Sequence, residues 1–556
     1  MSNQLKVYCK NINEYIDFTG GETVGDIGRR IADRLDFKPF CCQVNNKTED
    51  LTFPLFAPKV IEFVHPSSET ARRVYIHSLC MLLYRALYEL YPGERLVIEH
   101  SLSRGYYCRM TGVVKPSGTM VSRLKEKMLQ LVALDLPFER KERLRTDVIE
   151  IFRKQKLFNK VRLLETVHEL YTVYYRLDGV CDTYYGPLVT STGCLGVFDL
   201  QLHEDGMLLL GPDPVNISQP QQPLPQKKMF RAFQEHLQFN KIIGVDNVGE
   251  LNETVDHRRT ADLINVAEAL HDKKIASIAD DIAARYREGG ARVVLIAGPS
   301  SSGKTTTTKR LAIYLMTNLL VPRMISLDNY FVDRTLTPRD ETGDYDYESL
   351  YALDLEAFNK DLNDLIDGKE VSLPTYNFET GKRIYKGDKI KLGDNTVLLI
   401  EGIHGLNPQL TASIEDKMKY RVYVSALTTL SIDDHNWIPT TDNRLLRRII
   451  RDHKYRGTSA IETIRRWPSV RRGEEKWIFP FQENADSTFN SSLIFELGVM
   501  KDYAMAILQG VPHDTPEYSE AYRLMKFLSF FAPIGERLIP PTSLLREFLG
   551  GSSFHY

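Results

Sequence analysis

Two glycines, a lysine and a threonine stand at a spacing that suits phosphate chemistry. From Val293 the chain reads VVLIAGPSSSGKTTTT, an apolar run followed by a loop that Gly298 and Gly303 bound. A Cβ at either bend would obstruct a backbone whose N–H groups must turn inward around an anion. Lys304 offers a cation to the β and γ phosphates, and Thr305 offers a hydroxyl to Mg²⁺. We therefore predict a nucleotide-binding loop made of Gly298, Pro299, Ser300, Ser301, Ser302, Gly303, Lys304, Thr305 and Thr306.

The flanking residues decide between this loop and an ordinary surface loop rich in serine and glycine. Five apolar residues precede Gly298, and RLAIYLM follows at helical spacing. A strand, a loop and a helix in this order are the context that the motif needs. We therefore favour phosphate binding.

Two carboxylates follow apolar stretches farther along the chain. Asp328 comes directly after PRMISL, and Glu401 ends TVLLIE. An open parallel sheet binds its ligands at the carboxyl ends of the strands. We expect Asp328 to act as the base for an acceptor hydroxyl and Glu401 to hold Mg²⁺ with Thr305. The alternatives are a capping aspartate and a glutamate hydrogen-bonded to loop backbone.

A basic segment from Asp442 to Ser459 carries arginines at helical spacings, namely Arg444, Arg447, Arg448, Arg451 and Arg456. Gly457 follows them and would allow movement. Guanidinium groups clamp phosphates bidentately, so we predict a mobile lid in which Arg448, Arg451 and Arg456 are catalytic. A solvated helix face and a nucleic-acid patch are the alternatives.

These side chains need a scaffold that brings distant segments to one edge. Apolar strand patterns occur at VVLIAG, PRMISL, TVLLIEG, YRVYVSA and SSLIFE, with helical patterns between them. Such alternation predicts an α/β fold with a parallel sheet covered by helices on both faces.

Residues 291–500 resemble the uridine kinase and phosphoribulokinase family. The matching segments occur in family order: GPSSSGKTTT, SLDNYF, YDYESLYALD, LPTYNF, IEGIHGLNP and DNRLLRRIIRD. The resemblance implies a P-loop kinase that uses ATP and Mg²⁺, with Asp328 as catalytic base and Glu348 at the ribose hydroxyls. It also places Tyr330, Tyr376 and Arg448 on the acceptor side.

Two positions depart from the pattern of uridine kinases. Gly381 stands where that family has a histidine that contacts the pyrimidine, and Arg465 stands where it has a base-reading glutamine. A site that hydrogen-bonds a base edge discriminates strongly, so these changes could redirect specificity. A nucleoside is our first acceptor, with a sugar phosphate or a pantothenate-like alcohol as the alternative.

The front of the chain resembles two other modules. Residues 1–65 resemble a TGS domain, a β-grasp fold, and residues 66–215 resemble the editing domain of threonyl-tRNA synthetase, an α+β module. The metal-binding pairs of that editing domain fall here on Met81 and Arg85 and on Tyr184 and Leu188. None of these four side chains replaces an imidazole or thiolate at a zinc site. The resemblance implies a retained fold and lost editing activity.

The remaining segments join these parts. Residues 216–285 form a linker rich in proline and glutamine and then a helical connector, which we expect to brace the following domain. Residues 286–556 form the kinase-like domain. Its last segment, IPPTSLLREFLGG, is predicted to dock on another domain or subunit or to belong to the core.

Composition narrows the setting. The 556 residues include 71 basic and 73 acidic side chains, which argues against a dedicated nucleic-acid or membrane-surface protein. Seven cysteines without metal spacing, no leader pattern and no membrane-spanning run predict a cytoplasmic protein. An RNA-binding regulatory role through the synthetase-like modules stays open as an alternative, as does homo-oligomerisation.

Overall fold

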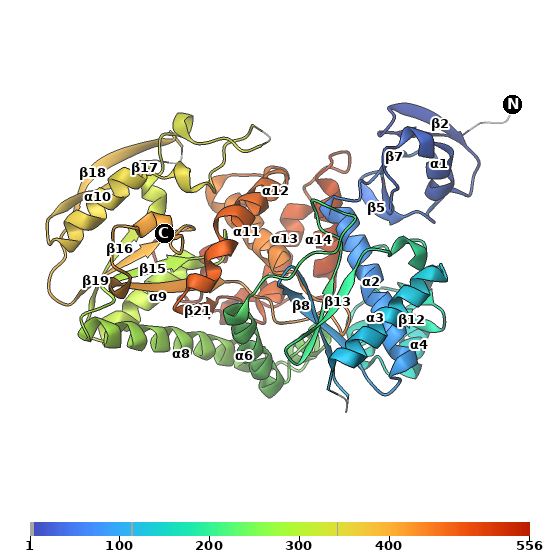
Figure 1. Ribbon diagram of the computed structural model, residues 1–556, viewed down its shortest axis with the longest axis horizontal. Coiled ribbons are helices and arrows are strands. Elements are labelled where there is room, and N and C mark those ends of the chain that lie inside the picture. Colours follow the sequence, from blue (N-terminus) through green and yellow to red (C-terminus); the bar gives the residue numbers. More distant parts are fainter. Residues whose placement is uncertain (1–4, 113–114, 342, 378) are drawn as a thin grey trace.

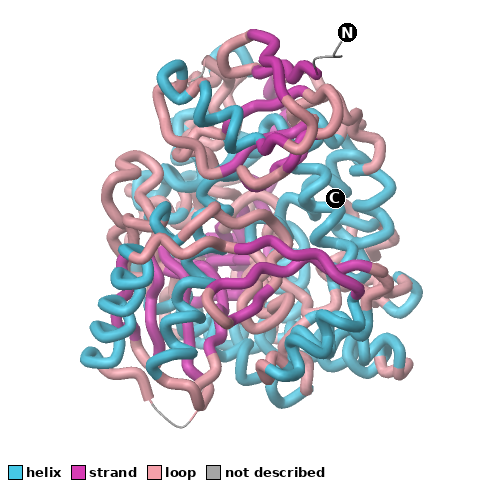
Figure 2. Tube along the Cα trace, turned by 90° about the vertical axis from the view of Figure 1, so that its right-hand side faces the viewer, coloured by secondary structure: helices cyan, strands magenta, loops and turns pink. Residues whose placement is uncertain are grey.

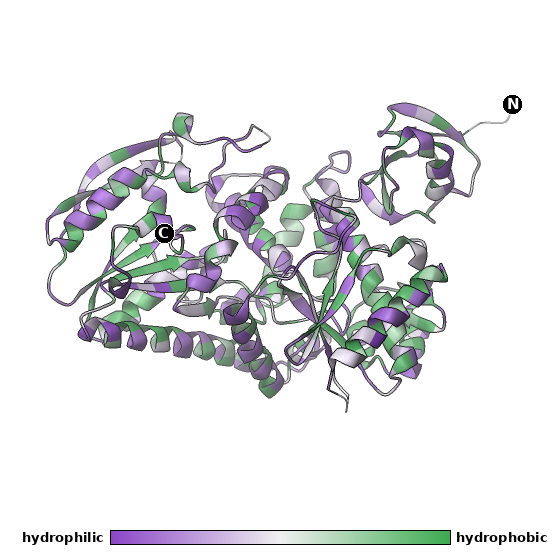
Figure 3. Cartoon of the chain, in the orientation of Figure 1, coloured by the Kyte–Doolittle hydropathy of each residue, from purple (hydrophilic) through white to green (hydrophobic). Residues whose placement is uncertain are grey.

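The computed structural model describes residues 5–112, 115–341, 343–377 and 379–556 (Figure 1). A five-stranded sheet in the order β16-β19-β15-β20-β21 lies at the centre of the C-terminal half, and every neighbouring pair in it is parallel. Its strands are β15 (Val293–Ala297), β16 (Val321–Ser326), β19 (Thr396–Glu401), β20 (Lys419–Ser425) and β21 (Ser487–Asn490). The buried strands β15 and β19 are hydrophobic along their length (Figure 3). The α/β fold with a parallel sheet is confirmed.

Helices cover both faces of this sheet because alternate strand residues enter different cores. Val294 and Ile296 belong to a core shared with α8 (Thr260–Arg287) and α9 (Lys304–Thr317). Val293 and Leu295 belong to a second core, shared with α10 (Leu355–Ile366). The remaining helices of this half are α11 (Thr440–Arg456), α12 (Ala460–Trp477), α13 (Glu496–Leu508), α14 (Tyr518–Ser529) and α15 (Arg546–Leu549).

The fifth strand lies earlier than the sequence predicted. SSLIFE forms a turn before α13, while the strand is the preceding Ser487–Asn490. Leu493 and Phe495 are buried nevertheless. A short apolar run does not by itself distinguish a strand from the buried entry to a helix, and here the run packs into the core as that entry.

Two further segments flank the site edge of the sheet. The 3-10 turn η3 (Leu327–Tyr330) follows β16 directly. An antiparallel hairpin, β17 (Val371–Asn377) and β18 (Lys382–Ile390), stands beside it. Phe378, within the predicted LPTYNF motif, is outside the described residues.

The first sixty residues form a small sheet in the order β2-β1-β7-β4-β5 with its own hydrophobic core, at one end of the molecule (Figures 1 and 2). The elements are β1 (Leu5–Cys9), β2 (Glu14–Phe18), α1 (Val24–Arg30), β4 (Cys41–Val44), β5 (Lys47–Asp50) and β7 (Val60–Phe63), with the small pair β3 (Glu22–Thr23) and β6 (Pro54–Leu55). Its likeness to a TGS domain stays a prediction.

The next part holds a long buried helix and two antiparallel sheets, β13-β14-β9-β8 and β10-β11-β12. Its strands are β8 (Leu96–Leu102), β9 (Gly105–Met110), β10 (Glu139–Leu144), β11 (Tyr171–Leu177), β12 (Val180–Asp182), β13 (Asp199–His203) and β14 (Gly206–Leu210). Its helices are α2 (Glu69–Leu90), α3 (Gly118–Ala133), α4 (Arg145–Lys154) and α5 (Phe158–Thr166).

The connector contains α6 (Lys227–Ile243), α7 (Val248–Asp256) and α8, and α8 runs along α9 as expected for a brace. The exact limits of the four predicted domains stay predictions. Within the described parts of the chain, no helix combines the length and apolarity that crossing a membrane needs.

Candidate active site

The predicted phosphate loop connects β15 to α9. Gly298 is required by close packing, since a Cβ there would lie 2.0 Å from the carbonyl oxygen of Val424. Gly303 has a positive φ of 82°, which an L side chain rarely adopts, and it caps the start of α9. The loop is therefore shaped by the two glycines that the motif identified.

Buried arginines hold the loop from behind. Arg444 donates from Nε to the carbonyl oxygen of Ser300 at 2.9 Å, and Arg447 donates from Nη1 to that of Ser301 at 3.3 Å. Glu474 accepts the Ser300 N–H at 3.1 Å and pairs with Arg444. These two arginines thus position the loop and do not face solvent, which excludes them from a basic nucleic-acid face.

The cation and the metal-type ligands meet at the mouth of the loop. Burial lowers the pKa of Lys304, whose ammonium donates to the carbonyl oxygen of Pro299 at 3.1 Å. Glu401 accepts hydrogen bonds of 3.3 Å from the hydroxyls of Thr305 and Ser326. Its pKa is raised to about 7 by burial and then by the charge of Asp328. Both of these hydrogen-bond donors to Glu401 are side-chain hydroxyls, whereas the alternative predicted hydrogen bonds from the loop backbone.

Asp328 stands at the same edge with a different environment. Ser326, the last residue of β16, pairs in register with Glu401 of β19, so the two strands end together. Asp328 lies in the turn that follows and is exposed. The N-cap of that turn is Ser326, not Asp328. An exposed carboxylate beside Lys304 and Glu401 is available to a substrate.

The predicted lid arginines converge on one carboxylate. Asp452 accepts ion pairs from Arg451 at 2.8 Å, Arg448 at 3.3 Å and Arg456 at 3.6 Å. Burial would raise the pKa of Asp452, but the three guanidinium groups outweigh it and keep the pKa low. Sequence reasoning missed Asp452, although its spacing of four residues from Arg448 and Arg456 is a signal for such pairs.

These arginines lie on α11, a continuous helix that ends at Gly457 in a left-handed cap. Arg448 also donates to the Ser300 hydroxyl at 3.0 Å. Burial lowers the pKa of Arg456 overall, although the negative charge of Asp328 favours the protonated form of Arg456. The positive charge of Arg451 adds to the effect of burial in lowering the pKa of Lys304. The structure thus brings together the loop, Asp328 and the lid arginines, while their catalytic roles stay predictions.

Glu348 and Tyr376, predicted for the acceptor side, lie in different environments, and their roles stay predictions. Glu348 packs so closely on α12 that a Cβ at Gly473 would lie 2.3 Å from its own Cβ. Burial raises the pKa of Glu348 to about 7 against the opposing charge of Arg448. Tyr376 lies on β17, nearly buried, with its ring centroid 5.6 Å from that of Phe331.

Tyr330 does not reach this site, contrary to the prediction. It is 1% exposed, and its hydroxyl donates to Asp361 at 3.0 Å. The cause is the 3-10 turn, in which residues three apart eclipse each other. Tyr330 therefore follows Leu327 into the core, and Asp328 between them faces outward.

The two positions that depart from the uridine kinase pattern have structural roles. Gly381 turns the β17–β18 hairpin with φ of 68°, and its carbonyl oxygen accepts the N–H of Arg334 at 2.9 Å. Arg465 is 63% exposed and pairs with Glu517 at 2.8 Å. Gly381 has no side chain that could contact an acceptor, and the guanidinium of Arg465 is engaged by Glu517.

The four positions that align with the metal-binding pairs of the editing domain make packing contacts, ion pairs or hydrogen bonds within the protein. Met81 and Leu188 are buried, and Arg85 pairs with Asp178 and Glu89 at 2.7 Å each. The Tyr184 hydroxyl donates to Asp182 at 2.8 Å. Among the described residues, no group of three or more His, Cys, Asp or Glu side chains is placed to hold a metal ion.

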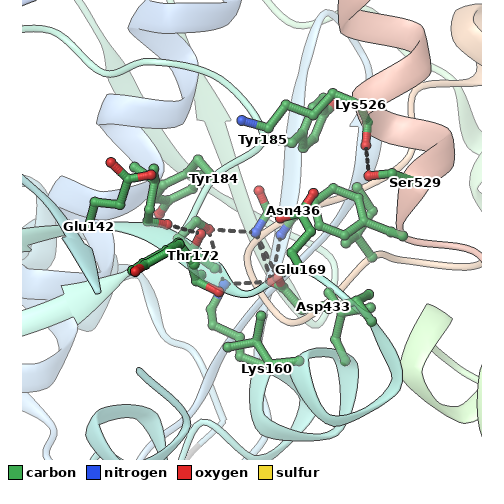
Figure 4. A pocket seen from close by; sticks show the side chains of 18 of the residues that line it. Glu142, Lys160, Glu169, Thr172, Tyr184, Tyr185, Asp433, Asn436, Lys526 and Ser529 are labelled. Carbon is green, nitrogen blue, oxygen red and sulfur yellow. Dashed lines mark hydrogen bonds and ion pairs between the residues drawn. The ribbon is translucent and has the colours of Figure 1, made fainter. Parts of the chain in front are cut away.

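A cavity of about 320 Å³ lies beside Tyr184, away from the phosphate loop (Figure 4). It is bounded by α5, β11, the loop before α11 and the end of α14, and none of the predicted kinase residues lines it. At its floor Lys160 contacts Asp433 across the junction between the two halves of the chain.

Comparison with known proteins gives two separate likenesses. The threonine–tRNA ligase of Rubrobacter xylanophilus is 30% identical over 34% of this chain, and that of Pelodictyon phaeoclathratiforme is 32% identical over 32%. The chain spans only 29% and 27% of the length of these two relatives. The uridine kinase of Staphylococcus aureus is 30% identical over 35% of this chain and 84% of its own length.

The phosphate loop, Asp328, Glu401 and the arginine helix fall within residues 293–493, which match the model of the "Phosphoribulokinase / Uridine kinase family". Together with the Staphylococcus aureus relative, this match shows that the chain belongs to the phosphoribulokinase and uridine kinase family.

Proposed function

We propose that this protein is an ATP-dependent small-molecule kinase, and that its acceptor is the 5'-hydroxyl of a nucleoside. The observation that carries the proposal is the convergence of Lys304, Asp328, Glu401 and the Asp452-bound arginines on one edge of the sheet. Phosphoryl transfer needs positioning and charge stabilisation more than covalent chemistry, and this cluster supplies both.

Each group has a defined task in such a reaction. The exposed carboxylate of Asp328 accepts the proton of the attacking hydroxyl. Lys304 and the guanidinium groups of Arg448, Arg451 and Arg456 neutralise charge on the transferring phosphoryl oxygens. Release of Arg456 from Asp452 would free the most exposed of these cations to follow the phosphate.

Mg²⁺ fits the pair Thr305 and Glu401. Their oxygens are already within hydrogen-bond distance, and the neighbouring charge of Asp328 makes ionised Glu401 costly without a cation. Bound Mg²⁺ would neutralise charge on the β and γ phosphates.

The acceptor is the least determined part. A sugar phosphate or a pantothenate-like alcohol is the alternative, since neither Gly381 nor Arg465 provides a base-reading group at the site. A nucleic-acid patch on the basic helix loses support, because Arg444 and Arg447 are buried behind the loop. The RNA-binding regulatory alternative, which rests on the synthetase-like modules, stays open.

A substrate panel tests the proposal directly. Purified protein with ATP and Mg²⁺ is assayed for ADP release with nucleosides, sugar phosphates and pantothenate-like alcohols. Stimulation by a nucleoside, with the 5'-monophosphate as product, is the expected result. Stimulation by another alcohol would move the acceptor assignment, and no stimulation by any compound would contradict kinase activity.

Glu348 predicts a pH dependence of acceptor binding. Its carboxylate, with a pKa raised to about 7, can accept charge-assisted hydrogen bonds from two ribose hydroxyls, whereas the protonated acid accepts hydrogen bonds more weakly. Because the ionised fraction rises about tenfold from about pH 6 to about pH 8, we expect acceptor affinity to rise by up to that factor. Calorimetric titration of the acceptor without ATP measures it. Glu348→Gln should flatten the profile, and an unchanged profile would contradict this role.

A further inference from the structure

The C-terminal segment turns back onto the nucleotide loop. In Figure 1 the C-terminus lies next to β15 and α9. Leu544 is fully buried and packs against Gly303, where an added Cβ would lie 2.6 Å from Leu544 Cδ2. The ring of buried Phe548 lies 5.1 Å from the guanidinium of Arg447. Residues 544–549 therefore anchor the chain end on the loop and on α11.

This anchor places a carboxylate on a phosphate-binding group. Oε2 of Glu547 accepts hydrogen bonds from the N–H of Thr306 at 3.3 Å and from its hydroxyl at 2.6 Å. Thr306 lies in the first turn of α9, where backbone N–H groups have no partner within the helix and attract anions. The glutamate thus occupies a donor pair that a nucleotide phosphate would use.

Tyr556 contacts the same residue of the nucleotide loop, Thr306, that Glu547 contacts. The Tyr556 hydroxyl lies 2.8 Å from Oγ1 of Thr306, and its ring lies 5.8 Å from the ammonium of Lys309. Because Lys304 takes the β and γ phosphates, the α phosphate and the nucleoside extend toward the Thr306 side of the loop. The Tyr556 ring therefore occupies the region where the nucleoside would bind.

We infer that the chain end is an autoinhibitory mimic of the nucleotide, in which Glu547 takes the place of the α phosphate and Tyr556 that of the nucleoside. The inference rests on the proposed nucleotide function. Binding of ATP then requires these two side chains to leave. Glu547 needs only a side-chain rotation, and Tyr556 is 58% exposed, while buried Leu544 and Phe548 keep the segment attached.

Affinity measurements on the full chain test the competition. Calorimetry gives the Kd of ATP for the wild type, Glu547→Gln and a variant that ends at Gly551 and so lacks Tyr556. Glu547→Gln removes the charge that strengthens both hydrogen bonds from Thr306, which should tighten ATP binding about tenfold. Pyrophosphate, which fills only the Lys304 end of the loop, should bind all three proteins with Kd values within about twofold of one another.

Glu547→Gln should also lower the thermal midpoint, because it removes an anion from a helix N-terminus. Tighter binding with lower stability separates competition from simple damage. Glu536→Gln is the matched control. Glu536 precedes residues 544–549, and its carboxylate accepts from Tyr503 at 2.7 Å and from Arg546 at 3.5 Å. Because neither contact involves Thr306, ATP affinity should not change.

Each remaining outcome counts against the inference. If ATP binds the wild type and Glu547→Gln equally, or binds either tail variant more weakly, then the segment caps α9 or completes the nucleotide site and does not inhibit. If ATP binds none of the proteins, both the inference and the proposed kinase function are overturned.

Discussion

Replacing Asp328 by asparagine should reduce kcat by about 10²–10⁴, the range that a positioned general base contributes. Asparagine keeps the size of the side chain and removes its negative charge, and with it the ability to accept a proton. ATP affinity should stay within about threefold, since Asp328 lies in the turn after β16 and not among the donors of the loop. Steady-state kinetics with the best acceptor from the panel, together with calorimetric ATP titration, give both quantities.

Asp333→Asn is the matched control for this change. Asp333 is another exposed aspartate five residues on, and its carboxylate accepts the N–H of Arg383 at 3.4 Å. Its replacement should leave kcat within about threefold of the wild type. A kcat of Asp328→Asn close to that of the control would remove Asp328 from the role of base.

Local patterns carried most of the prediction of the nucleotide half. Glycine spacing and the apolar run before it specify a strand, a tight loop and a helix over some sixteen residues, and β15 and α9 lie where that pattern places them. Asp328 and Glu401 were found because parallel strands end at a common edge, and Ser326 and Glu401 pair in register there.

The failures arise where tertiary packing decides. The family resemblance placed Tyr330 on the acceptor side, but the 3-10 turn directs its side chain into the core with Leu327. Arg444 and Arg447 share a helix with the lid arginines, yet they are buried against the loop carbonyls. A basic helix has the same composition whether its arginines face phosphate or backbone.

Contacts between distant segments had no sequence signal. Glu547 meets Thr306 across 241 positions, and Lys160 meets Asp433 across 273. Neither pair belongs to a periodic pattern or a motif, so only the folded chain brings them together. The family resemblances do not predict these contacts either. Each resemblance covers one part of the chain, whereas the contacts join the synthetase-like part and the chain end to the kinase-like part.

Replacing Lys160 by methionine should lower the free energy of unfolding by about 3–5 kcal/mol, because it leaves buried charge uncompensated. Lys160 is fully buried and lies 2.7 Å from both Asp182 and Asp433, and its role as their counter-ion joins α5 to the loop before α11. His435 in that loop also contacts Asp182, at 2.7 Å. Urea unfolding at neutral pH measures the loss. Lys360→Met, which removes an exposed lysine paired with Asp364, should cost only about 0–1 kcal/mol.

The pH dependence identifies buried charge as the cause. In the wild type, burial would raise the pKa of Asp182, but Lys160 and His435 hold it below its usual value. That stabilisation is present above the unfolded pKa of about 3.9 and is lost as the pH falls through the lower folded value. In Lys160→Met the counter-charge of the lysine is lost, so burial should hold the pKa of Asp182 above its unfolded value and ionisation of Asp182 then opposes folding. The difference in free energy of unfolding between the wild type and Lys160→Met should therefore decrease as the pH falls from about 7.5 to about 5. Adding Asp182→Asn and Asp433→Asn to Lys160→Met should recover part of the loss at neutral pH, whereas a difference that is independent of pH would point to lost packing of the lysine stem.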